Sequence, residues 1–180
     1  MKIKKTILLG VTGSIASYKA CEIIGLLKRE GFDVKVLLTK EAAEFITKLT
    51  LQTLSRNKVF DNMFEAPEEW NPAHISLAES ADLILVAPAT ANIIAKLAGG
   101  ICDDMVTCTV LASGAPVLIA PAMNGRMYKN RITQENISRL KKAGYHFVGP
   151  EKGRLACGCE DIGHIADVRE IVKEAKRLVK

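Results

Sequence analysis

The chain has 180 residues, of which 48% are apolar and 25% charged, with a net charge of +5 and five cysteines. These values are typical of one globular domain and exclude a disordered or low-complexity chain. The apolar run after the basic start ends at Gly10, which excludes a signal peptide or a membrane span there, so we expect a cytoplasmic protein. An odd number of cysteines favours free thiols in a reducing compartment. Scattered positive charge and few aromatic residues give no argument for nucleic-acid binding.

Short apolar runs alternate with segments of helical periodicity along the chain. Strands are expected at 6–11, 33–39, 83–87, 117–120 and 145–148. Helices are expected at 15–30, 40–54 in one or two pieces, 90–97, 105–113, 133–143 and 168–179. The strand runs are apolar without alternation, as in strands covered on both faces, so the sequence predicts an α/β domain with a five-stranded, doubly wound parallel sheet. Residues 61–72 and 150–162 are expected to form long loops.

The first strand leads into Gly10-Val11-Thr12-Gly13-Ser14-Ile15-Ala16, a strand-to-helix turn of the kind that binds phosphate. A dinucleotide site would prefer G-x-G-x-x-G and an acidic residue at the end of the second strand, and neither is present. That strand instead ends in Leu38-Thr39-Lys40, where a hydroxyl and a cation suit a terminal phosphate. The sequence therefore favours a mononucleotide, with a tight turn that binds nothing as the alternative.

The third strand ends in Ala87-Pro88-Ala89-Thr90-Ala91-Asn92, where small side chains leave room for a flat ring. Thr90 offers a hydroxyl to a ligand there, although it is equally suited to cap the next helix. Thr107, on the helix after Asp104, offers another hydroxyl, and a solvent-facing role is an equal alternative for it.

Three further groups follow or precede core strands in stretches expected to be loops. Asn124 lies in Pro121-Ala122-Met123-Asn124-Gly125-Arg126-Met127-Tyr128, directly after a buried strand, where ligand sites of parallel sheets lie. His74 precedes the strand at 83–87, and Cys157 follows the last strand. Each has a structural alternative: a turn amide, a helix-capping imidazole and a packed thiol.

The other cysteines indicate no metal site. Cys21, Cys102 and Cys108 are expected to pack between helices. Cys157 and Cys159 form a C-x-C pair without a second Cys or His pair at zinc spacing, so no metal is expected.

Taken in order, Gly13-Ser14-Ile15-Ala16, His74, Pro88-Ala89-Thr90-Ala91-Asn92, Pro121-Ala122-Met123-Asn124-x-x-Met127 and Leu155-Ala156-Cys157-Gly158 resemble the flavin-dependent cysteine decarboxylases. Within that family the chain resembles the stand-alone enzymes of coenzyme A biosynthesis that act on 4'-phosphopantothenoylcysteine, and the resemblance runs from Lys4 to about Asp167. It implies a flavodoxin-like, Rossmann-like three-layer fold with FMN as cofactor. It also implies trimers with sites between subunits, often assembled as dodecamers, and a separate phosphopantothenoylcysteine synthetase in the pathway.

The resemblance further implies roles for particular residues. FMN would oxidise the substrate thiol end to a thioaldehyde, CO2 would leave, and the resulting enethiolate would be reduced to 4'-phosphopantetheine. His74 would assist oxidation and decarboxylation, Asn124 would bind the substrate carboxylate, and Cys157 would donate the last proton from a loop that closes over the substrate. The implied cofactor contacts are Gly13, Ser14, Ile15, Thr39, Pro88, Thr90 and Thr107; the implied substrate contacts are Ala122, Met123, Asn124, Met127, Ala156 and Cys157.

One segment departs from the family pattern, which continues after the Cys-Gly pair with Asp and a glycine-rich run. Here Cys159-Glu160-Asp161 follows Gly158, so the acidic residue is displaced by one or two positions, which leaves the loop geometry and the part played by Cys159 open. Peptidyl-cysteine decarboxylases, flavin prenyltransferases and non-enzymatic regulatory relatives remain as alternatives. The Leu-Ala-Cys-Gly element favours the small substrate over the first two.

Overall fold

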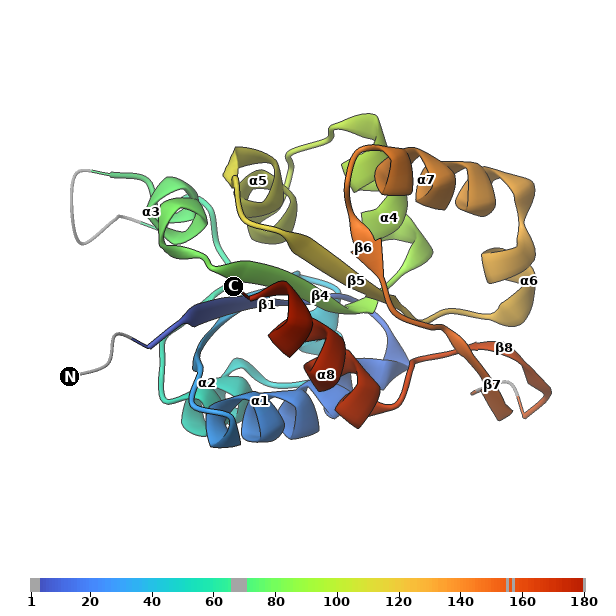
Figure 1. Ribbon diagram of the computed structural model, residues 1–180, viewed down its shortest axis with the longest axis horizontal. Helices are drawn as coiled ribbons and strands as arrows, with labels where there is room; N and C mark the ends of the chain where they lie inside the picture. Colours follow the sequence, from blue (N-terminus) through green and yellow to red (C-terminus); the bar gives the residue numbers. More distant parts are fainter. Residues whose placement is uncertain (1–3, 66–70, 155, 157, 180) are drawn as a thin grey trace.

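The computed structural model describes residues 4–65, 71–154, 156 and 158–179, and its centre is a parallel sheet of six strands. These are β1 (Thr6–Val11), β2 (Asp33–Leu38), β3 (Val59–Phe60), β4 (Leu83–Ala89), β5 (Val117–Pro121) and β6 (His146–Phe147). They lie in the order β3-β2-β1-β4-β5-β6, and Figure 1 labels β1, β4, β5 and β6 of this sheet. Without the short edge strand β3, this is the strand order of flavodoxins, and the order reverses between β1 and β4.

Helices cover both faces of the sheet, as Figure 1 shows. On one face lie α1 (Lys19–Arg29), α2 (Lys48–Ser55) and α8 (Val168–Leu178). On the other lie α3 (Ala73–Ser80), α4 (Ala91–Gly99), α5 (Met105–Ala112) and α7 (Arg131–Lys142). The predicted three-layer, doubly wound fold is therefore confirmed.

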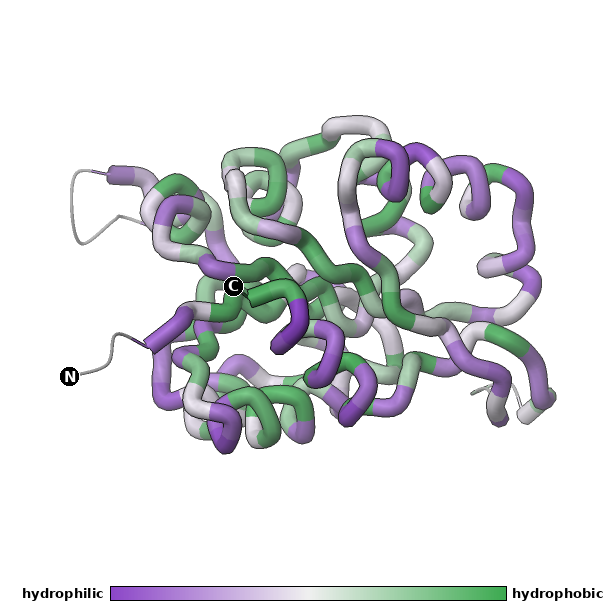
Figure 2. Tube along the Cα trace, in the orientation of Figure 1, coloured by the Kyte–Doolittle hydropathy of each residue, from purple (hydrophilic) through white to green (hydrophobic). Residues whose placement is uncertain are grey.

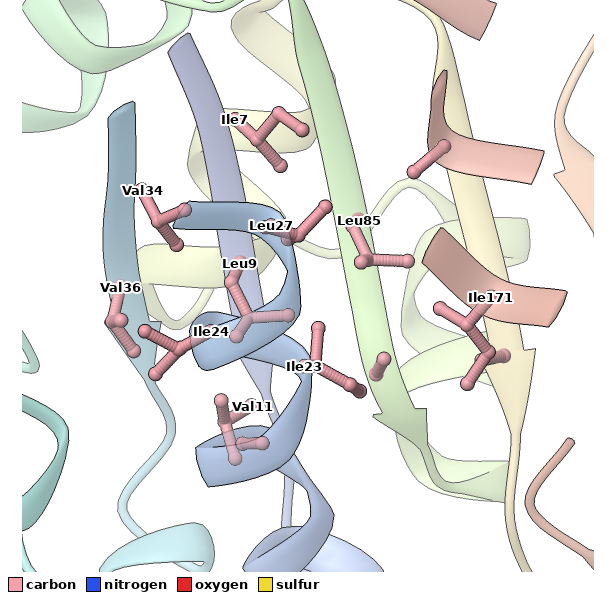
Figure 3. Close-up of a cluster of buried hydrophobic side chains, with 14 of the residues drawn as sticks. Ile7, Leu9, Val11, Ile23, Ile24, Leu27, Val34, Val36, Leu85 and Ile171 are labelled. Carbon is pink, nitrogen blue, oxygen red and sulfur yellow. The ribbon is translucent and has the colours of Figure 1, made fainter. Parts of the chain in front are cut away.

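The strands supply two cores because successive side chains point to opposite faces. Ile7 and Leu9 lie in the core under α1, to which Leu85 and, farther along the sheet, Ile171 of α8 also belong (Figure 3), whereas Leu8 packs on the opposite face. Apolar residues gather along the strands and polar residues on the outer helix faces (Figure 2), which explains why the strand sequences lack alternation. No helix in the described residues is long and apolar enough to cross a membrane.

Several predicted elements require correction. The sheet has six strands rather than the predicted five. The sequence did not indicate the additional strand, β3, because it is too short to show any periodicity. The expected helix at 15–30 is a 3₁₀ turn (Ile15–Tyr18) followed by α1, and the expected helix at 40–54 is a 3₁₀ turn (Ala42–Glu44) followed by α2. The expected loop at 150–162 is largely an antiparallel hairpin of β7 (Glu151–Arg154) and β8 (Glu160–His164).

Two expected loops also contain helices. His74 lies in the first turn of α3, and a short helix α6 (Gly125–Lys129) follows Asn124, whose side chain accepts a hydrogen bond from Arg126 N at its start. Cys102, expected to pack between helices, lies exposed between α4 and α5, whereas Cys108 is buried in α5.

Candidate active site

A buried threonine ties the two strands together where the sheet order reverses. Thr12 Oγ1 donates to the carbonyl oxygen of Pro88 (2.8 Å) and accepts from the backbone N–H of Thr90 (3.1 Å). These bonds hold the carboxyl ends of β1 and β4 at a fixed separation, at the point where doubly wound sheets bind ligands. Thr12 was not predicted as a site residue, because its partners are distant in sequence.

A cavity of about 300 Å³, here called the strand-end cavity, opens at this point. It brings together Gly13, Ser14, Thr39 and Thr90, four of the predicted cofactor contacts, from the ends of three strands. The other residues that line it are Thr12, Glu41, Ala91, Asn92, Ile93, Asp104, Ala122, Met123 and Met127. Lys40, which was expected to face a phosphate, is exposed and is not in this lining.

Three hydroxyls of the strand-end cavity share one hydrogen-bonding pattern. Ser14 Oγ accepts from Ala16 N (3.3 Å), Thr39 Oγ1 from Ala42 N (3.3 Å) and Thr90 Oγ1 from Ile93 N (3.2 Å). None of the three donates its proton to another described residue. Because a hydroxyl is both acceptor and donor, the three protons are available to an anionic ligand.

Two further features of the strand-end cavity are the close packing at Gly13 and the ion pair of Asp104 with Lys96. A Cβ on Gly13 would lie 2.5 Å from the Cβ of Glu41, so no larger residue fits there without a shift. Asp104, which caps α5 and lines the cavity, is paired with Lys96 (3.0 Å), as is Asp103 (2.8 Å). Partial burial lowers the pKa of Lys96, but its hydrogen bonds to Asp103 and Asp104 outweigh this and raise it. The lysine therefore stays charged and offsets a negative charge beside the cavity.

A second cavity of about 600 Å³, here called the hairpin cavity, adjoins the first and shares Ser14, Ala122 and Met123 with it. Asn124 and Ala156, two predicted substrate contacts, line it, and so does Ile15. Its remaining lining comes from Ala16, Tyr18, Arg154, Gly163, His164 and Ile165. The sequence did not indicate Tyr18, Arg154 and His164 as site residues. They line the cavity because the 3₁₀ turn carries Tyr18 to it and the hairpin carries Arg154 and His164.

The remaining predicted residues do not line either cavity. Pro88 contributes its carbonyl oxygen to Thr12. Thr107 is fully buried, and its hydroxyl bonds to the backbone of Asp104 in a capping box at the start of α5. His74 is half-buried, and its buried Nδ1 has no hydrogen-bond partner within the described part of the chain. Cys157 lies outside the described residues. Among the described residues, no group of three or more His, Cys, Asp or Glu side chains is arranged to hold a metal.

The comparison with known sequences identifies the family. The sequence profile of the Flavoprotein family matches residues 1–180. The chain belongs to the Flavoprotein family. This flavoprotein is similar to the "Probable phosphopantothenoylcysteine decarboxylase" of Streptococcus mutans, with 46% identity over 172 residues that cover 94% of this chain and 96% of that protein. It is also similar to the coenzyme A biosynthesis bifunctional protein CoaBC of Bacillus subtilis, with 48% identity over 176 residues that cover 96% of this chain.

The flavoprotein spans only 43% of the length of the Bacillus subtilis protein. Among solved structures, it is similar to a cysteine-to-serine mutant of PPC decarboxylase complexed with pantothenoylaminoethenethiol, with a TM-score of 0.87 and 30% identity. That match covers 97% of this chain and 98% of the other. The fold that carries the two cavities is therefore also the fold of a PPC decarboxylase mutant whose structure contains pantothenoylaminoethenethiol.

Proposed function

We propose that this flavoprotein is an FMN-dependent decarboxylase that converts 4'-phosphopantothenoylcysteine to 4'-phosphopantetheine in the cytoplasm. The observation that carries the proposal is the pair of adjoining cavities: one has three hydroxyl donors grouped for a phosphate, and the other contains Asn124. The two share the wall formed by Ala122 and Met123. A cofactor in the first and a substrate in the second would therefore be neighbours.

The strand-end cavity fits FMN because its donors form one group. Ser14, Thr39 and Thr90 would bind a single terminal phosphate, and Gly13 allows the backbone to approach it. When bound, FMN supplies the chemistry of this reaction by accepting two electrons from the substrate and returning them at the end. Ser14→Ala is expected to weaken FMN binding, and Thr53→Ala, which removes an exposed hydroxyl on α2 outside both cavities, is the control expected to leave it unchanged.

Asn124 would bind the substrate carboxylate in the hairpin cavity. A neutral amide donor orients the carboxylate without forming an ion pair, which would stabilise the charge that is lost with CO2. The electron pair left by CO2 needs an acceptor, and the C=S group of an oxidised substrate would provide it: a C=C bond forms as the negative charge moves to sulfur, which gives the enethiolate. Asn124→Asp places a like charge beside the carboxylate and is expected to abolish decarboxylation, so near-normal activity in this variant would contradict the role.

His74 and Cys157 would transfer protons. The buried Nδ1 of His74 has no hydrogen-bond partner among the described residues, so the imidazole is not committed to a structural hydrogen bond through this nitrogen. Cys157 would protonate the enethiolate in the final reduction. His74→Asn is expected to retain FMN but lose substrate oxidation, and Cys157→Ser is expected to release CO2 and accumulate the enethiol product.

In a trimer, each active site would combine His74 of one subunit with Asn124 of a neighbouring subunit. His74 lines neither cavity, whereas the apolar side chains of Ile15 (57% exposed) and Tyr18 (58% exposed) stand at the hairpin cavity. A second copy packed there would cover these side chains and supply His74 to the neighbouring site, and four such trimers would form the implied dodecamer. Mixing inactive His74→Asn and Asn124→Asp variants tests this, since mixed trimers with one intact site regain activity; no recovery after subunit exchange would contradict shared sites.

The direct test is to incubate the purified protein with phosphopantothenoylcysteine and to follow the product by mass spectrometry. Formation of 4'-phosphopantetheine without an added oxidant supports the proposal, because the electrons removed in the first step return in the last. A peptide ending in cysteine serves as the competing substrate. Turnover of the peptide alone would assign the chain to the peptidyl-cysteine decarboxylases instead.

A further inference from the structure

The hairpin packs directly on the turn that carries Asn124. Met123 N donates a hydrogen bond to the carbonyl oxygen of Gly163 in β8 (3.0 Å). A Cβ on Gly125 would lie 2.2 Å from Asp161 Oδ2 and 2.7 Å from the carbonyl oxygen of Ile162. The turn and β8 are therefore as close as glycine allows, and this contact joins two walls of the hairpin cavity.

One ion pair crosses this contact. Lys129, the last residue of α6, donates from Nζ to Asp161 Oδ1 (2.6 Å), and the same oxygen accepts from Ile162 N (2.8 Å). The hydrogen bond from Lys129, followed by that from Ile162, holds the pKa of Asp161 below its usual range. The carboxylate is thus ionised at neutral pH, and it connects the start of β8 to the helix that begins after Asn124.

A second ion pair on the hairpin has different geometry. Lys152 Nζ and Glu160 Oε1 lie 4.0 Å apart on paired strands, and the two side chains are 74% and 71% exposed. In contrast, Lys129 and Asp161 are 59% and 30% exposed, and their pair links two different elements. Glu160 therefore provides a matched control one residue away from Asp161.

We propose that Asp161 is a positioning residue for substrate binding, which through Lys129 keeps the Asn124 turn in register with the hairpin wall formed by Arg154, Ala156 and His164. The inference rests on the proposed function. It also explains the displaced acidic residue of this chain, because the carboxylate at this position anchors β8 to α6. Asp161 lines neither cavity, so it acts through Asn124 rather than on the substrate.

The test compares Asp161→Asn with Glu160→Gln in the FMN-loaded enzyme. Asp161→Asn is expected to raise KM for phosphopantothenoylcysteine about two- to fivefold, the range that one partly exposed ion pair supports, with little change in kcat or FMN affinity. Glu160→Gln is expected to retain the KM of the wild type. Lys129→Arg, which keeps a positive charge opposite Asp161, is expected to retain the KM of the wild type, whereas Lys129→Gln is expected to raise KM as Asp161→Asn does.

A double-mutant cycle measures the interaction between Asp161 and Lys129. If the two groups act through each other, Asp161→Asn combined with Lys129→Gln raises KM no further than the more affected single variant. The inference is overturned if the two single substitutions multiply their effects on KM in the double variant. It is also overturned if Asp161→Asn and Glu160→Gln have equal KM values in an active enzyme. Either result leaves the proposed function intact. A wild-type enzyme that forms no 4'-phosphopantetheine would instead overturn the proposed function, and this inference with it.

Discussion

Replacing Gly163 with alanine is expected to detach the β7–β8 hairpin from the Asn124 turn. A Cβ at this position would lie 2.1 Å from the carbonyl oxygen of Met123, so the backbone would have to move. Gly163 also has φ of +133°, a conformation that costs other residues about 1–3 kcal/mol. Loss of the hydrogen bond between Met123 and Gly163 adds about 0.5–1.5 kcal/mol. Together these favour the detached hairpin by roughly 2–4 kcal/mol, which is about a 30- to 1,000-fold rise in its population.

Trypsin cleavage after Arg154 under native conditions measures this population, because cleavage follows the open form when opening is fast. Faster cleavage and a raised KM are expected for Gly163→Ala, with FMN retained. Gly25→Ala is the matched control, since Gly25 lies within α1 and its added Cβ would meet no atom within 4 Å. It is expected to stabilise the fold by about 0.5–1 kcal/mol without affecting the hairpin. Equal cleavage rates for Gly163→Ala and the wild type would refute the reasoning.

Three further predictions concern the cofactor, a thiol and a carboxylate. Ser14→Ala should weaken FMN binding about ten- to hundredfold in a fluorescence titration, because hydrogen bonds to charged groups contribute about 1.5–3 kcal/mol; an unchanged Kd would remove Ser14 from the site. Burial, with Cys102 nearby, raises the pKa of Cys108 to about 11, so at pH 8 iodoacetamide should modify the exposed Cys102 before Cys108 in a mass-spectrometric time course, and the reverse order would contradict this. Partial burial raises the pKa of Asp82, but its hydrogen bond from Thr6 N and its pairing with Lys5 lower it overall. Asp82→Asn should therefore destabilise the protein at pH 7, and the difference in unfolding free energy should shrink below about pH 4; a difference that does not depend on pH would contradict this.

The layers and main strands could be predicted because they depend on local sequence. Runs such as Leu83 to Val86 are apolar throughout, and that pattern by itself indicates strands covered on both faces. The edge strand at Val59 and Phe60 is too short for any periodicity. The hairpin consists mainly of polar residues and glycine, and among the described strands β7 and β8 pair with each other and lie outside the six-stranded sheet, so they lack the apolar signal of a core strand.

The candidate site could be predicted in part for the same reason. Gly13, Ser14, Thr39 and Thr90 directly follow strands, and the carboxyl ends of parallel strands meet at one edge. Thr12 could not be separated from its neighbours, since its hydroxyl partners lie on β4. Asp161 stood out only as a departure from a family pattern. Its partner Lys129 lies on a helix that the sequence did not indicate.

The wall shared by the two cavities has a thermodynamic consequence. Ala122 and Met123 would contact the cofactor on one side and the substrate on the other, so each ligand changes the surface that the other meets. Coupling between two binding equilibria is reciprocal: whatever factor the cofactor contributes to substrate affinity, the substrate returns to cofactor affinity. If the cofactor strengthens substrate binding, the substrate strengthens cofactor binding by the same factor, so the Kd of FMN measured with and without substrate would report the coupling across this wall.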